Sequence, residues 1–170
     1  INQIHKKLGT KLSKALPALH VFSGSDYTAI FCRKGKIKPL KCLEKNELIQ
    51  TILGSFGDSD NMNPDDIDAV GKFTSELYGL KKINCVNEAR LQIFLQKCKP
   101  AKSASTLSHI KSLDAALLPP CSKVLYQKLL RVNYICSVWL NVDEAIANIP
   151  LPENSGLILT NTGYNMKWFD

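Results

Sequence analysis

One carboxylate stands beside a run of cations in the first quarter of the chain. Asp26 lies in the segment Gly24-Ser25-Asp26-Tyr27-Thr28, after the apolar run 15–22 and before the basic run 33–41. Carboxylate oxygens are ligands for hard cations such as Mg²⁺ and Mn²⁺, and neighbouring cations hold a polyanion. Phosphodiester hydrolysis with two metal ions needs several converging carboxylates, with the ions about 3.5 to 4 Å apart. Asp26 is therefore a candidate metal ligand and catalytic residue at one corner of such a site.

The basic run is a candidate surface for phosphate groups. Residues 1–46 hold nine Lys and one Arg against Asp26 and Glu44, whereas the whole chain has a formal net charge of +7. Few aromatic or amide side chains interleave with these cations, which favours contact with a nucleic-acid backbone over reading of base edges. The alternative is an ordinary solvated surface rich in lysine. The candidate nucleic-acid-binding residues are Arg33, Lys34, Gly35, Lys36, Lys38 and Lys41.

Other chemistries find little support. The six cysteines (Cys32, Cys42, Cys85, Cys98, Cys121 and Cys136) form no Cys-x-x-Cys pair, so we expect small reduced hydrophobes and no zinc or redox site. His5, His20 and His109 are scattered, and we expect structural roles for them. The acidic stretch 58–68 departs from a calcium-binding loop at three positions, and a polar loop leading into a capped helix explains it better. Ser23 and Ser25 lack the context of a serine nucleophile.

These candidates must be positioned by helices, because helical periodicity dominates the chain. Asn63 and Pro64 predict a capped helix start that Gly79 ends. A further helix is predicted from near Val86, with a linker at 99–105 and a short helix at 106–113. The apolar stripe of the helix from Val86 is Leu91, Phe94, Leu95 and Cys98.

The longest predicted helix follows Pro119-Pro120. Its apolar positions recur at alternating steps of four and three and should lie in the core: Leu125, Leu129, Val132, Cys136 and Trp139. The polar residues on its other side are predicted to form a solvated face: Lys123, Gln127, Lys128 and Arg131. Two short strands are predicted about the turn 161–163. The predicted fold is mainly α, a helical domain with a small C-terminal β-hairpin.

The segment from Leu16 to Thr28, followed by Lys34-Gly35-Lys36, resembles the Gly-(Ser/Cys)-Asp-Tyr segment of the flap-endonuclease/XPG-type PIN-fold nucleases. In that family the matching Asp helps to hold divalent metals, and a helix-two-turns-helix element that follows grips the DNA backbone. The resemblance implies that residues 1–46 are the end of a PIN-like unit with a basic helix-turn-helix-like extension, and that residues 47–170 are a helical region. Asp26 is the only catalytic position that the resemblance transfers.

Over almost its whole length the chain also resembles a largely uncharacterised group of animal proteins associated with mobile elements. The resemblance is carried by Leu16 to His20, Gly24 to Thr28, Lys34 to Lys41, Val86 to Leu91, Leu118 to Cys121, Arg131 to Tyr134 with Trp139, and Lys167-Trp168-Phe169. This second resemblance implies little about activity, because the function of the group is itself mostly inferred from the PIN-like segment.

The remaining acidic ligands of the PIN-fold nucleases lie on strands before this segment, and no Asp-x-Asp run precedes Ile1. Because Ile1 stands inside a helical pattern and the chain stops on strand-like residues, we expect a piece of a longer protein. Bound Mg²⁺ or Mn²⁺ is expected only where a missing N-terminal part supplies further carboxylates. Endonuclease activity would then belong to the full-length protein, with this chain alone inactive. The Gly-rich hairpin of the family is reduced to Gly35, which leaves side-chain contacts for phosphate binding.

Three hypotheses follow. The chain is a fragment of a metal-dependent nuclease, a nuclease-derived nucleic-acid-binding module without catalysis, or a helical scaffold for protein interaction. The expected partners are nucleic acid, with DNA favoured over RNA, and the N-terminal part of the same protein. No apolar stretch approaches the roughly 18 to 20 residues that span a bilayer. We therefore expect no membrane partner and an intracellular location, and the nucleic-acid hypotheses are consistent with a nuclear one.

Overall fold

The computed structural model describes residues 6–59, 61–97, 114–145 and 150–168. They form a mainly α-helical fold with one C-terminal β-hairpin, as predicted. The predicted linker at 99–105 and short helix at 106–113 lie outside the described residues. The elements in chain order are α2 (Thr10–Ser23), α3 (Ile37–Leu43), α4 (Glu47–Gly54), α5 (Pro64–Leu77), α6 (Val86–Lys97), the 3₁₀ turn η1 (Ala115–Leu117), α8 (Ser122–Leu140), β1 (Leu157–Thr160) and β2 (Gly163–Met166).

Local capping explains where two helices begin. The side chain of Asn63 accepts a hydrogen bond from the amide of Asp65, at 3.0 Å, and Pro64 occupies the first turn of α5. Asn46 caps α4 in the same way, accepting from the amide of Ile49 at 3.1 Å. After α5, Gly79 takes a φ of 92°, a conformation that glycine adopts without strain. The predicted capped start and glycine stop of this helix are confirmed.

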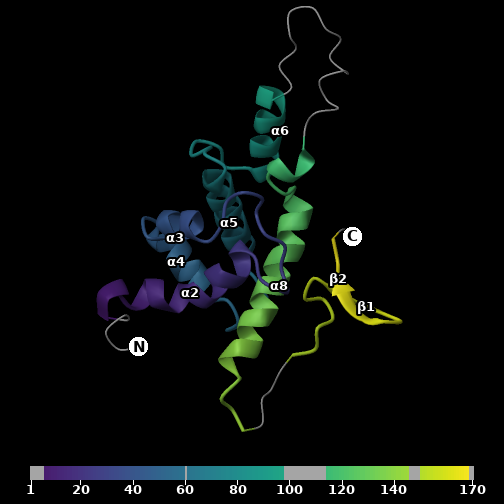
Figure 1. The fold of residues 1–170 in the computed structure, drawn as a ribbon. Coiled ribbons are helices and arrows are strands. Elements are labelled where there is room, and N and C mark those ends of the chain that lie inside the picture. The colour runs from purple at the N-terminus through teal and green to yellow at the C-terminus, as the bar shows by residue number, and fades with distance from the viewer. Residues whose placement is uncertain (1–5, 60, 98–113, 146–149, 169–170) are drawn as a thin grey trace, which may run out of the picture.

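The core forms around α8, which runs through the middle of the molecule (Figure 1). Leu125, Leu129, Val132 and Cys136 of α8 are buried in one cluster with residues of α2, α4 and α5, so the predicted apolar side of this helix is largely confirmed. Trp139, predicted to belong to it, keeps 39% of its surface exposed. Residues on both sides of position 46, the predicted boundary between the PIN-like unit and the helical region, share this core.

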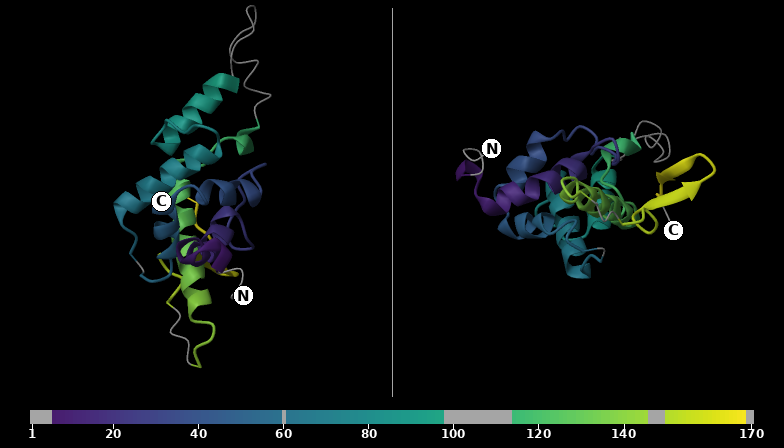
Figure 2. Two further views of the ribbon diagram at one scale, coloured as in Figure 1. Left: turned by 90° about the vertical axis from the view of Figure 1, so that its left-hand side faces the viewer. Right: turned by 90° about the horizontal axis from the view of Figure 1, so that it is seen from below.

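The opposite side of α8 differs from its prediction. Of the four residues predicted to be solvated, only Lys123 is exposed, whereas Gln127, Lys128 and Arg131 are buried. The C-terminal segment with the hairpin lies on the side of α8 opposite to α2, as two views of the molecule agree (Figures 1 and 2). Because the loop after α2 covers Lys128 and the C-terminal segment covers Arg131, even polar residues of α8 are enclosed.

The apolar stripe predicted for α6 is wrong at Leu91 and Leu95, whereas Phe94 is half-buried. Val86, Ala89 and Ile93 are the buried residues of this helix, whereas Leu91 and Leu95 are 56% and 57% exposed. Cys98 lies outside the described residues. Only one side of α6 reaches the rest of the fold, and the position of α5 rather than side-chain hydropathy selects which side that is.

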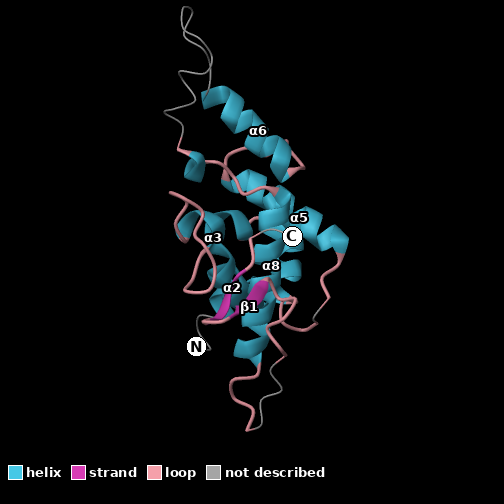
Figure 3. Cartoon of the chain, turned by 90° about the vertical axis from the view of Figure 1, so that its right-hand side faces the viewer, coloured by secondary structure: helices cyan, strands magenta, loops and turns pink. Residues whose placement is uncertain are grey.

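The two predicted strands form an antiparallel hairpin in which Leu157 pairs with Met166 and Thr160 with Gly163 (Figure 3). The amide of Lys167 donates to the carbonyl oxygen of Gly156, at 2.9 Å, and extends the closure of the hairpin beyond the strands. Tyr164 donates its hydroxyl proton to Glu153, at 2.7 Å. None of the described helices combines the length and the apolar composition needed to cross a membrane.

Candidate functional site

A tight turn after α2 presents Asp26 to solvent. Ser25 and Thr28 exchange backbone hydrogen bonds of 3.0 and 3.2 Å, and the buried Thr28 hydroxyl donates to the carbonyl oxygen of Val21. The turn is therefore anchored on the end of α2, and Asp26 lies exposed at its tip. Asp26 also lines the edge of a cavity of about 380 Å³, to which Arg131, Tyr134 and Tyr164 contribute.

The surroundings of Asp26 do not fit a two-metal centre. No other carboxylate lines its cavity, and the described residues contain no group of three His, Cys, Asp or Glu side chains that could hold a metal. Five of the six cysteines are described and carry free thiols, and burial raises the pKa of Cys136 to about 12. The metal-binding and catalytic role of Asp26 stays a prediction, and no hydrolytic step is derived for it.

Lys36, predicted to contact phosphate, is turned toward the protein. Its Nζ donates to the carbonyl oxygen of His20, at 2.6 Å, and to that of Gly24. These carbonyls belong to the last turn and C-cap of α2, where a cation also complements the helix dipole. Partial burial lowers the pKa of Lys36. In this arrangement the ammonium holds the loop 24–36 against α2.

The other predicted cations remain at the surface, and one further cation joins them. Arg33, Lys38 and Lys41 are exposed, and Lys34 lies with its Nζ 4.2 Å from the ring centroid of Tyr78. The pKa of Lys34 is lowered by burial first, and also by the charges of Lys38 and Lys97. Lys41 follows Lys38 by one helical turn on α3, and we call Lys34, Lys38, Lys41 and Lys97 the cationic face.

Sequence reasoning missed Lys97. It closes α6, more than fifty residues after the basic run, and nothing in its own neighbourhood marked it. The ion pairs of the described residues, Lys11–Glu47 at 3.0 Å and Lys14–Asp58 at 3.1 Å, connect α2 to α4 and its following loop. No residue of the cationic face takes part in them. Within the described part of the chain, no carboxylate therefore forms an ion pair with the cationic face.

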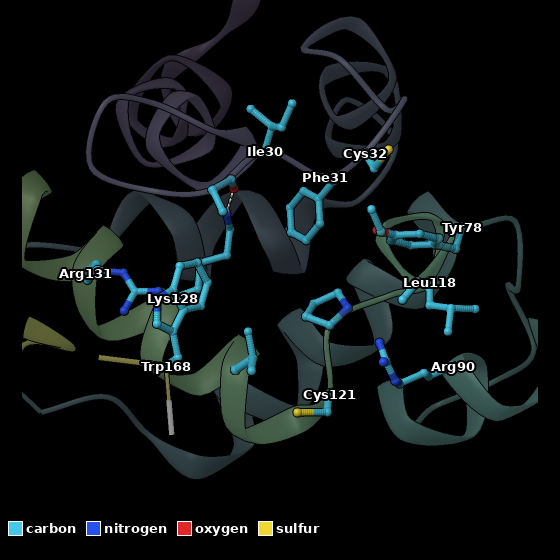
Figure 4. Close-up of a pocket in the computed structure, with 15 residues that line it drawn as sticks. Ile30, Phe31, Cys32, Tyr78, Arg90, Leu118, Cys121, Lys128, Arg131 and Trp168 are labelled. Atoms are coloured by element: carbon cyan, nitrogen blue, oxygen red, sulfur yellow. Dashed lines mark hydrogen bonds between the residues drawn. The ribbon is translucent and has the colours of Figure 1, made fainter. Parts of the chain in front are cut away.

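A second group of cations lies inside the molecule, where the sequence predicted a solvated helix face. Lys128 is 4% exposed, and its Nζ donates to the carbonyl oxygen of Ala29 while lying 4.6 Å from the ring centroid of Phe31 (Figure 4). Burial lowers the pKa of Lys128 to about 7, and the charges of Arg131 and Lys36 act in the same direction.

Arg131, only 1% exposed, joins α8 to the C-terminal segment. Its Nη1 donates to the carbonyl oxygens of Gly156 and Lys167, both at 2.7 Å, and its guanidinium carbon lies 5.5 Å from the ring centroid of Trp168. Its Nε is buried without a hydrogen-bond partner in the described structure. Lys128 and Arg131 line one cavity of about 350 Å³ together with Arg90, which donates from Nη1 to the carbonyl oxygen of Pro119.

Comparison of the chain with protein-family models, curated proteins and solved structures finds no match. The likeness to PIN-fold nucleases therefore stays a prediction from the sequence. The fold assembles two groups of cations, the cationic face at the surface and the buried set around Lys128.

Proposed function

We propose that this chain binds the phosphate backbone of nucleic acids through the cationic face, without reading base sequence. The observation that carries the proposal is that Lys34, Lys38 and Lys97, from the 24–36 loop, α3 and α6, lie close enough for the charges of Lys38 and Lys97 to lower the pKa of Lys34. Repulsion among these cations is relieved when phosphates bind and release their counterions. DNA is the preferred partner over RNA, in an intracellular, nuclear setting.

The proposal covers both a fragment of a PIN-like nuclease and a nuclease-derived binding module, because the residues of this chain bind the polyanion in either case. Asp26 is the one residue proposed to join metal binding, with Mg²⁺ or Mn²⁺ as the group that activates water in such enzymes. Further carboxylates from elsewhere in a longer protein would have to complete that site, since those in the described residues do not gather around Asp26.

Fluorescence anisotropy with short duplex and single-stranded DNA tests the binding proposal across a salt series. The variant Lys34→Ala/Lys38→Ala/Lys41→Ala removes three members of the cationic face, and Lys72→Ala/Lys81→Ala/Lys123→Ala removes three exposed lysines elsewhere. If each lysine neutralises one phosphate, the first variant lowers the log–log salt slope on duplex DNA by about 2 to 3, and the second leaves it near that of the parent. Equal loss in both folded variants, or no binding by the parent, contradicts the proposal.

A helical scaffold for protein interaction is the second candidate. Leu91 and Leu95 favour it, because they expose an apolar strip on α6 instead of facing the core. A double substitution to Gln, Leu91→Gln/Leu95→Gln, should then abolish capture of a protein partner without changing affinity for DNA. Loss of DNA affinity in this variant would place the apolar strip in the nucleic-acid interface instead.

A further inference from the structure

Basic side chains, and no carboxylate, line the cavity beside Lys128. Lys128 and Arg131 line it from α8 and Arg90 from α6, and its remaining lining contains no Asp or Glu. Cations enclosed in protein are ordinarily paired with carboxylates, because burial removes their hydration. Here backbone carbonyls accept from all three, and the buried Nε of Arg131 has no partner in the described structure. The basic side chains of the lining therefore have no anionic partner within the described residues.

Three aromatic side chains, Phe31, Tyr78 and Trp168, also line the same cavity. Figure 4 shows Lys128, Arg131 and Trp168 toward one side, Tyr78 and Arg90 toward the other, and Phe31 between them. Aromatic faces stack on planar rings, and one guanidinium group can bind two phosphate oxygens through two parallel hydrogen bonds. The volume of about 350 Å³ lies within the range of small-ligand pockets.

We propose that this cavity binds one nucleotide, with its phosphate on Lys128 and Arg131 and its base between the aromatic side chains and Arg90. A ring that carries a phosphate uses both sets of side chains, whereas inorganic phosphate uses only the first set and a nucleoside only the second. The inference concerns a pocket separate from the cationic face.

Two sources supply a nucleotide, a free mononucleotide or the end of a strand. Tyr78 connects the pocket to the cationic face, because it lines the cavity and lies under the ammonium of Lys34. A strand held on the cationic face would therefore run close to the pocket. This strand-end form rests on the proposed function, whereas binding of a free mononucleotide does not.

Calorimetric titration with AMP, adenosine and inorganic phosphate tests the proposal on the parent chain. We expect AMP to bind at least tenfold more tightly than either half alone. Lys128→Met keeps the apolar stem and removes the charge, and should weaken AMP binding at least tenfold, whereas Lys123→Met on the exposed side of α8 should leave it unchanged. Absent AMP binding, or equal affinity in folded Lys128→Met, overturns the proposal.

Arg90→Met provides a second decision if Lys128→Met fails to fold, because Arg90 lies on α6 and is only half-buried. It should also weaken AMP binding at least tenfold, and undiminished binding in this folded variant rejects a nucleotide pocket.

The source is decided with single-stranded DNA that ends in a 5′-phosphate or a 5′-hydroxyl. A preference for the phosphate that AMP competes away assigns a strand end, and AMP binding without that preference assigns a free nucleotide. AMP binding that survives in Lys34→Ala/Lys38→Ala/Lys41→Ala while DNA binding is absent in every variant supports the pocket and rejects the proposed function. These experiments therefore distinguish failure of the nucleotide pocket from failure of nucleic-acid binding by the cationic face.

Discussion

The ammonium of Lys128 donates a hydrogen bond to the carbonyl oxygen of Ala29, 99 residues away in the chain. This contact connects the middle of α8 to the loop that follows Asp26. The Nζ of Lys128 also lies 5.8 Å from the ring centroid of Phe22 and 4.6 Å from that of Phe31. The loop that carries the predicted functional residues is thus held by a buried amine on the central helix. The amine keeps this hydrogen bond, although the charges of Arg131 and Lys36 add to burial in lowering its pKa.

The first prediction concerns the pH dependence of stability. The pKa of Lys128 falls from an ordinary 10.5 to about 7 in the folded chain, so between these values the unfolded chain binds more protons. The contribution of Lys128 to the free energy of unfolding should therefore rise with pH from about 7 to 10.5, by up to about 1.4 kcal/mol per pH unit. Urea unfolding at pH 7, 8 and 9 measures it. Lys128→Met should lose this rise and Lys123→Met should keep it, whereas parallel curves for parent and Lys128→Met would refute the shift.

The second prediction concerns Arg131 as the tether of the C-terminal segment. Arg131→Met removes the donor to the carbonyl oxygens of Gly156 and Lys167 and should lower the free energy of unfolding by roughly 2 kcal/mol or more. Hydrogen exchange should accelerate most in residues 156–168, because that segment loses its contact with α8. Lys123→Met is the matched control on the same helix. Unchanged exchange in the hairpin of Arg131→Met would contradict this role.

The third prediction compares two glycines of the hairpin region. A Cβ at Gly156, where φ is 71°, would lie 2.3 Å from the carbonyl oxygen of Gln127, whereas one at Gly163, where φ is 113°, meets nothing within 4 Å. Both substitutions to Ala strain the backbone, and only the first also pushes the segment away from α8. Gly156→Ala should therefore cost about 1 to 3 kcal/mol more stability than Gly163→Ala in urea unfolding. Equal costs would show that the close approach is absent.

The fourth prediction tests which side of α6 faces the core. Ile93 is buried and Leu91 is 56% exposed. Ile93→Ala should lower the free energy of unfolding by about 2 to 4 kcal/mol, and Leu91→Ala should change it by less than about 0.5 kcal/mol. Chemical denaturation of both variants decides the matter. A larger loss in Leu91→Ala would restore the stripe predicted from the sequence.

Local interactions made several elements predictable from the sequence. The cap of α5 at Asn63, the stop at Gly79 and the hairpin about 161–163 each depend on residues within a few positions of one another. The buried positions from Leu125 to Cys136 also followed from spacing, because one side of a core helix must be apolar. The sequence by itself determined these elements and the cluster of charge between residues 33 and 41.

Only the tertiary structure decided how the cations are used. Lys36 faces the end of α2, Lys97 joins the cationic face from another helix, and Lys128 and Arg131 lie inside the molecule. Periodicity reports the polarity of each side of a helix, but not whether distant segments, here the loop after α2 at Lys128 and the C-terminal segment at Arg131, cover the polar side. The carbonyl oxygens of the C-terminal segment accept the hydrogen bonds that make burial of the Arg131 charge tolerable. Such contacts join residues far apart in the chain, so no local sequence pattern could have predicted them.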